Sequence, residues 1–463
     1  MRRLLGVALL AASGCAVGPD YERPKTDVPP TWGEVADTSA AELSAWWTLF
    51  HDDSLNSLID RAVKANLDLR IAAGRVHEAR AELGVVLGGL FPEVDLDGSY
   101  AKSRLSPNGQ PFPVPSLYQS HYTAGAAASW EIDLFGSVQR GYEAATADYD
   151  SWIENRRNVL VVLLGDVARN YVGLRGNQLL LTVLRQNVVS AKDTEEITKA
   201  RLAAGVATSL DVVRAQALRA SAESAIPPVD AAIKQSIHRL GVLIGTPPET
   251  LTAELSPAKA IPTAPTRVIV GLPSELLRRR PDIRQAERKL AEATAAIGVA
   301  TAELYPRISL TGSFGLDSLG SADFLKWESR AWSLGPSVRW PIFAGGQIRA
   351  QIEVQDAQQE QALAAYERTV LTALEEVENS LVAYLREGER RRALDEAVVA
   401  NRQAVDLADD LYKKGLTSFI DVLDAQRALF LAQADQARSV AEVTLDLVAL
   451  YKALGGGWEP RSP

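Results

Sequence analysis

The chain has few of the residues that build metal centres, redox sites and disulfide frameworks. Among its 463 residues are one cysteine, one methionine, which is Met1, and four histidines. A single cysteine rules out an intramolecular disulfide, whatever the redox state of the compartment. The histidines lie too far apart in sequence to form a metal-ligand pair on one helix or turn, and they are His51, His77, His121 and His238. We therefore expect no metal site and no bound cofactor.

The sequence also lacks the signatures of common catalytic and nucleotide-binding sites. It contains no G-x-S-x-G elbow, no G-x-x-x-x-G-K-[ST] loop and no H-E-x-x-H motif. The formal net charge is −9, which argues against a nucleic-acid partner because the phosphate backbone attracts basic surfaces. These absences lead us to expect a protein that is not an enzyme and that does not bind nucleic acid.

The N-terminus has the pattern of a bacterial lipoprotein signal. A basic start precedes the apolar run Leu4–Ala12, which is too short to span a bilayer. Small residues then precede Cys15, so residues 1–14 are expected to be a signal peptide whose removal allows acylation of the Cys15 thiol. Residues 15–50 would follow as an extended, lipid-anchored segment. The alternative is an ordinary secretory signal with an incidental thiol.

The chain contains an internal repeat. Asp68–Ala101 matches Asp282–Gly315 without a gap at an offset of 214 residues, and the stretch around Gly205 matches that around Gly415 at an offset of 210. Glycine, proline and acidic positions keep their register in both comparisons. The sequence therefore predicts an internally duplicated chain with two structural halves.

The halves have predictable boundaries and contents. They are expected at residues 51–255 and 268–457, joined by a proline-rich linker at 256–267 and followed by a short tail at 458–463. Each half is expected to contain a helix that leads to a proline, two strands, a helical pattern of about 65 residues, a glycine turn and a return helix.

Four segments alternate between apolar and polar residues with the period of a half-buried strand. They lie at about residues 92–104, 120–134, 306–317 and 332–343. Each is about ten residues long and has an aromatic residue near one end, as in tilted transmembrane strands. Four strands cannot close a barrel in lipid, so two chains would share eight strands, or three would share twelve around an open lumen. A half-buried sheet of a soluble protein is the alternative.

Two very long helical patterns run from Gly136 to about Ala203 and from Gly345 to about Leu411, and neither contains proline. Small and apolar residues recur every three or four positions with charges between them, as in coiled coils. We expect two continuous helices, each about 100 Å long at 1.5 Å per residue. The alternative is a stack of shorter helices.

Glycine turns at Gly205 and Gly415 are expected to close two helical hairpins. Asp211 follows the first turn, and Asp421 and Asp424 follow the second. An acidic residue just after a turn is typical of a helix N-cap, which would explain Asp211 and Asp421 without a further role. Asp424 lies one turn inside the helix, where capping does not explain it.

Long motifs resemble the lipoprotein branch of the TolC-like outer membrane efflux proteins. They are "CAVGPDYERP", "LLRRRPDIRQAERKLAEATAAIGVATAELYPRISLTGSFG", "WPIFAGGQIRAQI", "DVLDAQRALF" and "ALGGGW". The resemblance implies a mixed α and β fold: a trimeric 12-stranded outer-membrane β-barrel, with four strands per chain, continuous with a long periplasmic α-helical barrel. It also implies a tripartite efflux system whose other members are a periplasmic adaptor and an inner-membrane resistance–nodulation–division transporter.

The resemblance assigns a role to the hairpin ends. In the family they meet at a periplasmic mouth, where acids line a constriction and a tyrosine helps to hold it closed. Some relatives have an arginine just after the turn glycine, where this chain has Thr417, and Arg214 is the candidate to replace it in a salt bridge. Carried over to this sequence, the gate comprises Asp421, Asp424, Tyr412, Asp211 and Arg214.

The expected function is therefore passive export of small molecules through a homotrimeric duct. The duct would lie in the outer membrane, held also by the lipid on Cys15, and would extend into the periplasm. Two alternatives remain at this point: the outer-membrane duct of a type I protein secretion system, and a periplasmic scaffold lipoprotein without a channel.

Overall fold

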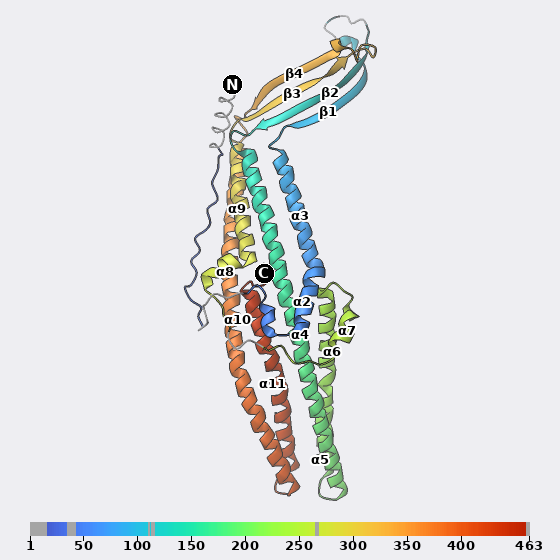
Figure 1. Cartoon of the computed structure of the whole chain (residues 1–463), viewed down its shortest axis with the longest axis vertical. Helices are drawn as coiled ribbons and strands as arrows, with labels where there is room; N and C mark the ends of the chain where they lie inside the picture. The colour runs from blue at the N-terminus through green and yellow to red at the C-terminus, as the bar shows by residue number, and fades with distance from the viewer. Residues whose placement is uncertain (1–15, 35–42, 110–111, 113–115, 264–267, 460–463) are drawn as a thin grey trace. The chain divides into compact units, whose positions relative to one another are not determined.

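A computed structural model of the chain describes residues 16–34, 43–109, 112, 116–263 and 268–459 (Figure 1). The chain forms two compact units, each discontinuous in sequence. The first comprises residues 1–25, 75–153 and 285–367, and the second comprises residues 26–74, 154–284 and 368–463.

The first unit contains a four-stranded antiparallel sheet with the strand order β1-β2-β3-β4. The strands are β1 (Glu93–Arg104), β2 (Tyr118–Ile132), β3 (Arg307–Ser318) and β4 (Arg330–Arg339). The alternation in the sequence predicted all four. Strand β4 ends at Arg339 rather than near residue 343, because Pro341 has no N–H group with which to continue the ladder.

The two faces of this sheet differ in chemistry. One is apolar and uncovered within the chain: the exposed fractions of Leu96 and Leu334 are 87% and 71%. The other carries cross-strand hydroxyl pairs at 2.7–2.9 Å, which are Ser99 with Thr123, Ser309 with Ser337, and Ser313 with Ser333. An uncovered apolar surface of this kind is typical of a face that contacts lipid or another protein.

Two helices of equal length lead into the sheet. They are α3 (Leu67–Gly88) and α9 (Pro281–Ala302), with 22 residues each. An indole fixes each junction: Trp130 Nε1 donates to the Leu90 carbonyl at 3.1 Å, and Trp340 Nε1 donates to the Leu304 carbonyl at 3.0 Å. The same hydrogen bond therefore recurs at corresponding places in the two halves of the sequence.

The helices that leave the sheet are uninterrupted, as predicted. Helices α4 (Ser137–Ala203) and α10 (Gln347–Lys413) contain 67 residues each. A glycine with positive φ precedes each of them, Gly136 at +79° and Gly346 at +86°. Only glycine adopts this backbone conformation without strain, so it permits the sharp change from strand to helix.

The helices that return from the two turns differ from each other. Helix α11 (Phe419–Ala453) is continuous over 35 residues, whereas the first return is divided into α5 (Ser209–Ser224) and α6 (Ile226–Leu243). The division lies directly before Pro227 and Pro228, which fit only the first turn of a helix.

Shorter elements complete the fold. They are η2 (Trp46–Phe50), α2 (Asp53–Ala65), η3 (Pro107–Gly109), η4 (Pro248–Leu251), α7 (Thr252–Leu255), α8 (Pro273–Arg279) and η5 (Trp327–Ser329). In the described part of the chain, no helix combines the length and the apolar character that crossing a bilayer requires.

The second unit is organised around an aromatic core. Trp46 stacks on Tyr451 with ring centroids 5.4 Å apart, and Phe50 meets both rings edge-on. The hydroxyl of Tyr171 donates to the carboxylate of Asp52 at 2.9 Å. Buried residues of α2, α4, α6 and α11 belong to the same core, so it fixes the two hairpins within the second unit.

Candidate functional site

The two hairpin turns have the same backbone geometry. Gly205 and Gly415 have φ angles of +75° and +73°. In the first turn Val206 N–H donates to the Arg201 carbonyl at 2.9 Å, and in the second Leu416 N–H donates to the Leu411 carbonyl at 2.9 Å. This pattern closes a helix C-terminus through a glycine in the left-handed conformation. The first hairpin consists of α4 and α5, and the second of α10 and α11.

Asp211 caps the helix after the first turn. Its carboxylate accepts hydrogen bonds from the Thr208 N–H at 2.9 Å and the Thr208 hydroxyl at 2.8 Å, and its own N–H donates to that hydroxyl at 3.2 Å. This reciprocal arrangement is a capping box. The N-cap itself is Thr208, so Asp211 takes part in capping from the third helical position and is not the N-cap residue, while a part in gating stays a prediction.

Asp421 has the same position after the second turn and more hydrogen bonds. Its carboxylate accepts from the Thr417 hydroxyl at 2.5 Å, and from the Ser418 hydroxyl at 2.7 Å and N–H at 3.1 Å. The bonds from Thr417 and then Ser418 stabilise the charged form and hold the pKa of Asp421 below its ordinary value. Asp421 is thus also a helix cap, and Thr417 is part of that cap.

Asp424 is the aspartate of this group whose carboxylate remains accessible. Its side chain is 65% exposed and makes one weak contact, with Arg427 Nη1 at 3.4 Å. Helix α11 therefore presents one fully engaged carboxylate in its first turn and one accessible carboxylate in the next. Of the three aspartates predicted for the gate, only Asp424 is available to bind a cation without loss of a capping contact.

Tyr412 links the two hairpins. It is 8% exposed, its ring lies 5.4 Å from that of Phe419, and the guanidinium carbon of Arg201 lies 4.4 Å from its ring centroid. Arg201 belongs to α4 and Tyr412 to α10, so this cation–π contact joins the ends of the two hairpins. The Tyr412 hydroxyl is buried and has no hydrogen-bond partner among the described residues.

An apolar cluster surrounds this contact. It contains Ala191, Ala215, Leu218, Tyr412, Phe419, Val422 and Leu423, drawn from both hairpins. Gln426 Nε2 adds a hydrogen bond of 2.7 Å to Thr194 Oγ1 across the same boundary. The two hairpins of one chain are therefore packed against each other as a pair.

Arg214 does not replace the missing arginine within one chain. It is half-buried and forms no ion pair or hydrogen bond with any described residue, and the carboxylate of nearby Asp211 is engaged by Thr208 instead. The expected salt bridge is thus absent among the described residues of one chain, and the carboxylate of Asp211 serves helix capping instead. Sequence reasoning missed Arg201, although its place in the last turn of α4 is one that basic residues favour.

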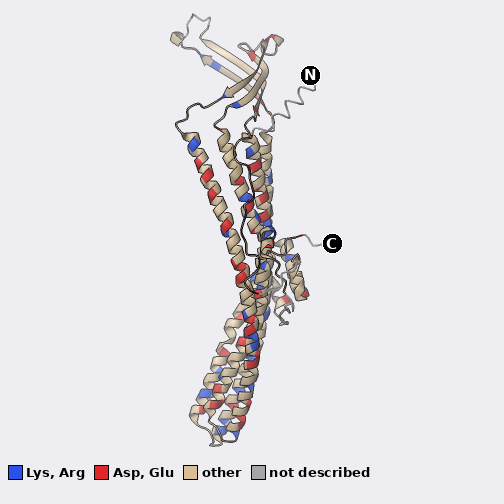
Figure 2. Ribbon diagram, turned by 90° about the vertical axis from the view of Figure 1, so that its left-hand side faces the viewer, with Lys and Arg blue, Asp and Glu red and all other residues tan. Residues whose placement is uncertain are grey.

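Acidic and basic residues alternate along the helices. Figure 2 shows them interspersed over the whole length of the helical elements. Close to the second turn, Lys413 and Lys414 pair with Asp409 and Asp410 at 2.5 and 2.7 Å. Asp424, by contrast, has only the weak contact with Arg427 at 3.4 Å.

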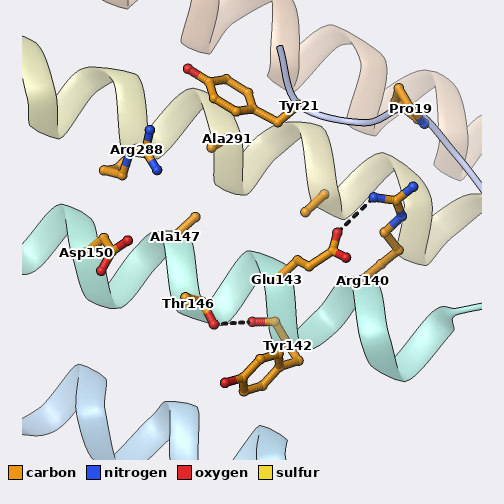
Figure 3. A pocket seen from close by; sticks show the side chains of 11 residues that line it. Pro19, Tyr21, Arg140, Tyr142, Glu143, Thr146, Ala147, Asp150, Arg288 and Ala291 are labelled. Carbon is orange, nitrogen blue, oxygen red and sulfur yellow. Dashed lines mark hydrogen bonds and ion pairs between the residues drawn. The ribbon is translucent and has the colours of Figure 1, made fainter. Parts of the chain in front are cut away.

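The N-terminal segment has its own docking site in the first unit (Figure 3). Arg140, which is 5% exposed, donates to the Val17 carbonyl at 3.1 Å and to the Asp20 carboxylate at 2.8 Å. Val17 N–H donates to the Phe135 carbonyl at 3.1 Å. Cys15 lies outside the described residues. The first residues after it are therefore fixed where strand β2 gives way to helix α4.

A small cavity lies beside this segment. It has a volume of about 290 Å³ and is lined by Tyr21, Thr146, Asp150, Arg288 and other residues of the segment, α4 and α9. Burial and the neighbouring carboxylate of Glu287 raise the pKa of Tyr21 to about 12. The tyrosine therefore stays protonated and holds the segment by its hydrogen bond to Glu287 at 3.3 Å.

Comparison with known proteins identifies the family to which this chain is similar. Residues 58–246 and 272–456 match the family described as outer membrane efflux protein. The chain is 35% identical to nodulation protein T of Rhizobium leguminosarum bv. trifolii, over 97% of this chain and 96% of that protein. It is 34% identical to the toluene efflux pump outer membrane protein TtgI of Pseudomonas putida, over 97% of both.

Solved structures agree with the sequence comparisons. The outer-membrane channel OprN has 36% sequence identity and a TM-score of 0.91, and the match covers 96% of this chain and all (100%) of that one. The open state of the Neisseria gonorrhoeae MtrE outer membrane channel has 30% identity and a TM-score of 0.83, with 96% and 99% covered. The chain therefore belongs to the outer membrane efflux protein family, the outer-membrane channels of tripartite efflux pumps.

Proposed function

We propose that three copies of this chain form a passive export duct whose periplasmic mouth is built from the six hairpin ends. The observation that carries the proposal is the sheet, which has an apolar face and two edges without strand partners among the described residues. Unpaired backbone groups cost several kcal/mol each in lipid, so the strands must be completed by other copies. Three copies give twelve strands and leave a lumen.

In this duct, Asp424 is the cation-binding residue of the mouth and Asp421 shapes it. Three copies of Asp424 bring exposed carboxylates together, and like charges at short distance repel each other. The closed state therefore depends on other contacts, among them the one between Tyr412 and Arg201. A mouth of this kind attracts cations and has two states whose balance a partner can shift.

The partners follow from the chemistry of a duct with no energy source of its own. A periplasmic adaptor would engage the hairpin ends and favour the open mouth, and an inner-membrane transporter of the resistance–nodulation–division type would drive export. The similarity to a toluene efflux pump protein supports small molecules as the cargo.

The lipid anchor is part of the same proposal. Acylation of Cys15 would place the lipid on the residue directly before Ala16. Ala16 packs closely against Gly136, since a Cβ atom added to Gly136 would lie 2.6 Å from the Cα and Cβ atoms of Ala16. The N-terminal segment would thus attach at the end of the sheet's strand β2 and the start of α4.

The test is conductance through planar bilayers with hexamminecobalt added on the periplasmic side. We expect a small, cation-preferring conductance that the trivalent ion blocks. Asp424→Asn should abolish the block, and so should the double replacement of Asp421 and Asp424 by alanine. Asp435→Asn is the matched control, because Asp435 also lies on α11 beside an arginine three residues on, Arg438. Equal block of wild type and the double variant would show that neither aspartate binds the blocking ion at the mouth.

A further inference from the structure

We propose that strand β4 pairs with strand β1 of the next copy in one defined antiparallel register, with Ser337 opposite Ser99 of the partner subunit. The proposal rests on the assembly of several copies described above and adds the residue pairing that closes it. It follows from the pairing of the four strands within one chain.

The two outer strands are open for pairing. Strands β1 and β4 have no strand on their outer sides among the described residues. All twelve residues of β1 and nine of the ten in β4 are exposed. Strands β2 and β3 pair with each other over eleven residues. In the proposed register β4 and β1 of the partner subunit overlap over eight, from Arg339 opposite Asp97 of the partner subunit to Trp332 opposite Arg104 of the partner subunit.

The two hairpins of the sheet have equivalent registers. Glu93 pairs with Ser129 in the first hairpin, and Arg307 pairs with Arg339 in the second. Adding 214 to the number of Glu93 gives Arg307, and adding 210 to that of Ser129 gives Arg339. These are the offsets at which the sequence repeats itself. The pairing of the strands therefore follows the repeat residue by residue.

The junction between the two halves then predicts the junction between copies. Ala127 of β2 pairs with Ser313 of β3. The same two offsets, 210 forward and 214 back, turn this pair into Ser337 of β4 and Ser99 of β1. A ring of identical copies alternates first and second halves, so each β4 meets the partner's β1 as β2 meets β3 within the chain.

This register is also chemically consistent. It keeps the apolar residues of both strands on one face, because the side-chain period in a strand is two. It places Arg339 opposite Asp97 of the partner subunit. Within the chain Arg339 faces Arg307, another positive charge, and like charges directly opposite each other destabilise a sheet. The partner's Asp97 would neutralise this pair.

Cysteine cross-linking tests the register directly, since the chain has one native cysteine, Cys15. Paired Cα atoms in an antiparallel sheet lie about 4.5–5.5 Å apart, within the range for a disulfide. Full-length protein with Ser337→Cys and Ser99→Cys should therefore oxidise to covalent trimers that a reductant separates. Ala127→Cys with Ser313→Cys is the matched control, because it has the same geometry but cross-links within one chain.

Displaced pairs set the specificity of the test. Ser337→Cys with Asp95→Cys is displaced by four residues, or about 13 Å, and should not cross-link. The native mass of each detergent-solubilised variant reports assembly independently of the disulfide. Efficient cross-linking of Ser337→Cys with Asp97→Cys or Ala101→Cys in place of Ser99→Cys would overturn the register. If the protein forms trimers but no pair of β1 and β4 positions cross-links them, the contact between these strands is overturned. If the wild-type protein forms no trimer, the proposed duct itself is overturned.

Discussion

The guanidinium of Arg201 lies over the ring of Tyr412, with its Cζ atom 4.4 Å from the ring centroid. The two residues come from different hairpins and are more than two hundred positions apart. Around them, residues of both hairpins form one apolar cluster. A movement that separates the hairpin ends must therefore break this contact, which makes it a candidate determinant of the closed mouth.

Replacing either partner should favour the open mouth. A partly desolvated cation–π contact contributes ~0.5–2 kcal/mol, so Arg201→Ala should raise the resting conductance roughly 2- to 30-fold. Tyr412→Ala should act in the same direction, and the effects of the two changes should not add. Tyr412→Phe is the control, because the hydroxyl has no partner among the described residues. If Tyr412→Phe opens the duct as far as Tyr412→Ala, the ring contact is not what holds it closed.

Replacing Asp421 should affect the stability of helix α11, whereas replacing Asp424 should affect conduction. Asp421→Ala removes the acceptor of three hydrogen bonds, so amide hydrogen exchange in the first turn of α11 should become faster. Asp424→Ala should leave that exchange unchanged. The pKa of Asp421 is lowered in the folded state, so its stabilising effect is complete above its ordinary pKa and is lost as pH falls through the lowered value. Faster exchange in Asp424→Ala alone would reverse this assignment.

Asp446 should make the protein more stable at mildly acidic pH. Burial, with the nearby charges of Glu442 and then Glu387, raises its pKa from 3.8 to about 6, and Arg169 opposes the shift. The folded state then binds more protons, so the contribution of Asp446 to stability falls as pH rises from about 4 to 6. Asp446→Asn should stabilise the protein at pH 7 by about 1–2 kcal/mol, a value discounted for partial exposure.

Thermal unfolding of wild type and Asp446→Asn across that pH range would check this prediction. We expect the difference between the two proteins to shrink as pH falls below the raised pKa. A difference that stays constant from neutral pH down to about 4 would contradict the assignment, since only titration of Asp446 makes it vary.

Arg140 should hold the N-terminal segment against α4. Arg140→Ala removes the hydrogen bonds to Val17 and Asp20, so trypsin should cleave after Lys25 faster in the folded protein. Arg140→Lys should give an intermediate rate, because an ammonium group cannot reproduce the planar fork of guanidinium donors. Unchanged cleavage in Arg140→Ala, with an unchanged melting temperature, would show that other contacts suffice.

Cys15 should be the first residue of the mature protein. Globomycin, which inhibits the lipoprotein signal peptidase, should cause the precursor to accumulate in cells, as seen by immunoblotting. Cys15→Ser should abolish incorporation of labelled fatty acid but still permit assembly, because the strands are themselves a membrane anchor. Normal processing in the presence of globomycin would point to an ordinary secretory signal.

The sequence alone determined the local elements of this protein. Alternation with a period of two specified the strands, and two long stretches without proline specified α4 and α10, because both patterns depend on neighbours within a few positions. Gly205 and Gly415 marked the turns because their positive φ angles suit glycine. Even the division between α5 and α6 has a local signal in Pro227 and Pro228.

Only the tertiary structure decided what the candidate site residues do. The sequence already separated Asp421, which capping could explain, from Asp424, which it could not, but only the structure shows how far the hydrogen bonds of the turn engage the first and leave the second exposed. It gave no sign that Arg201 would cover Tyr412, or that Arg140 would hold Val17. Such contacts depend on which helix faces pack together, and residues distant along the chain meet only after that packing is complete.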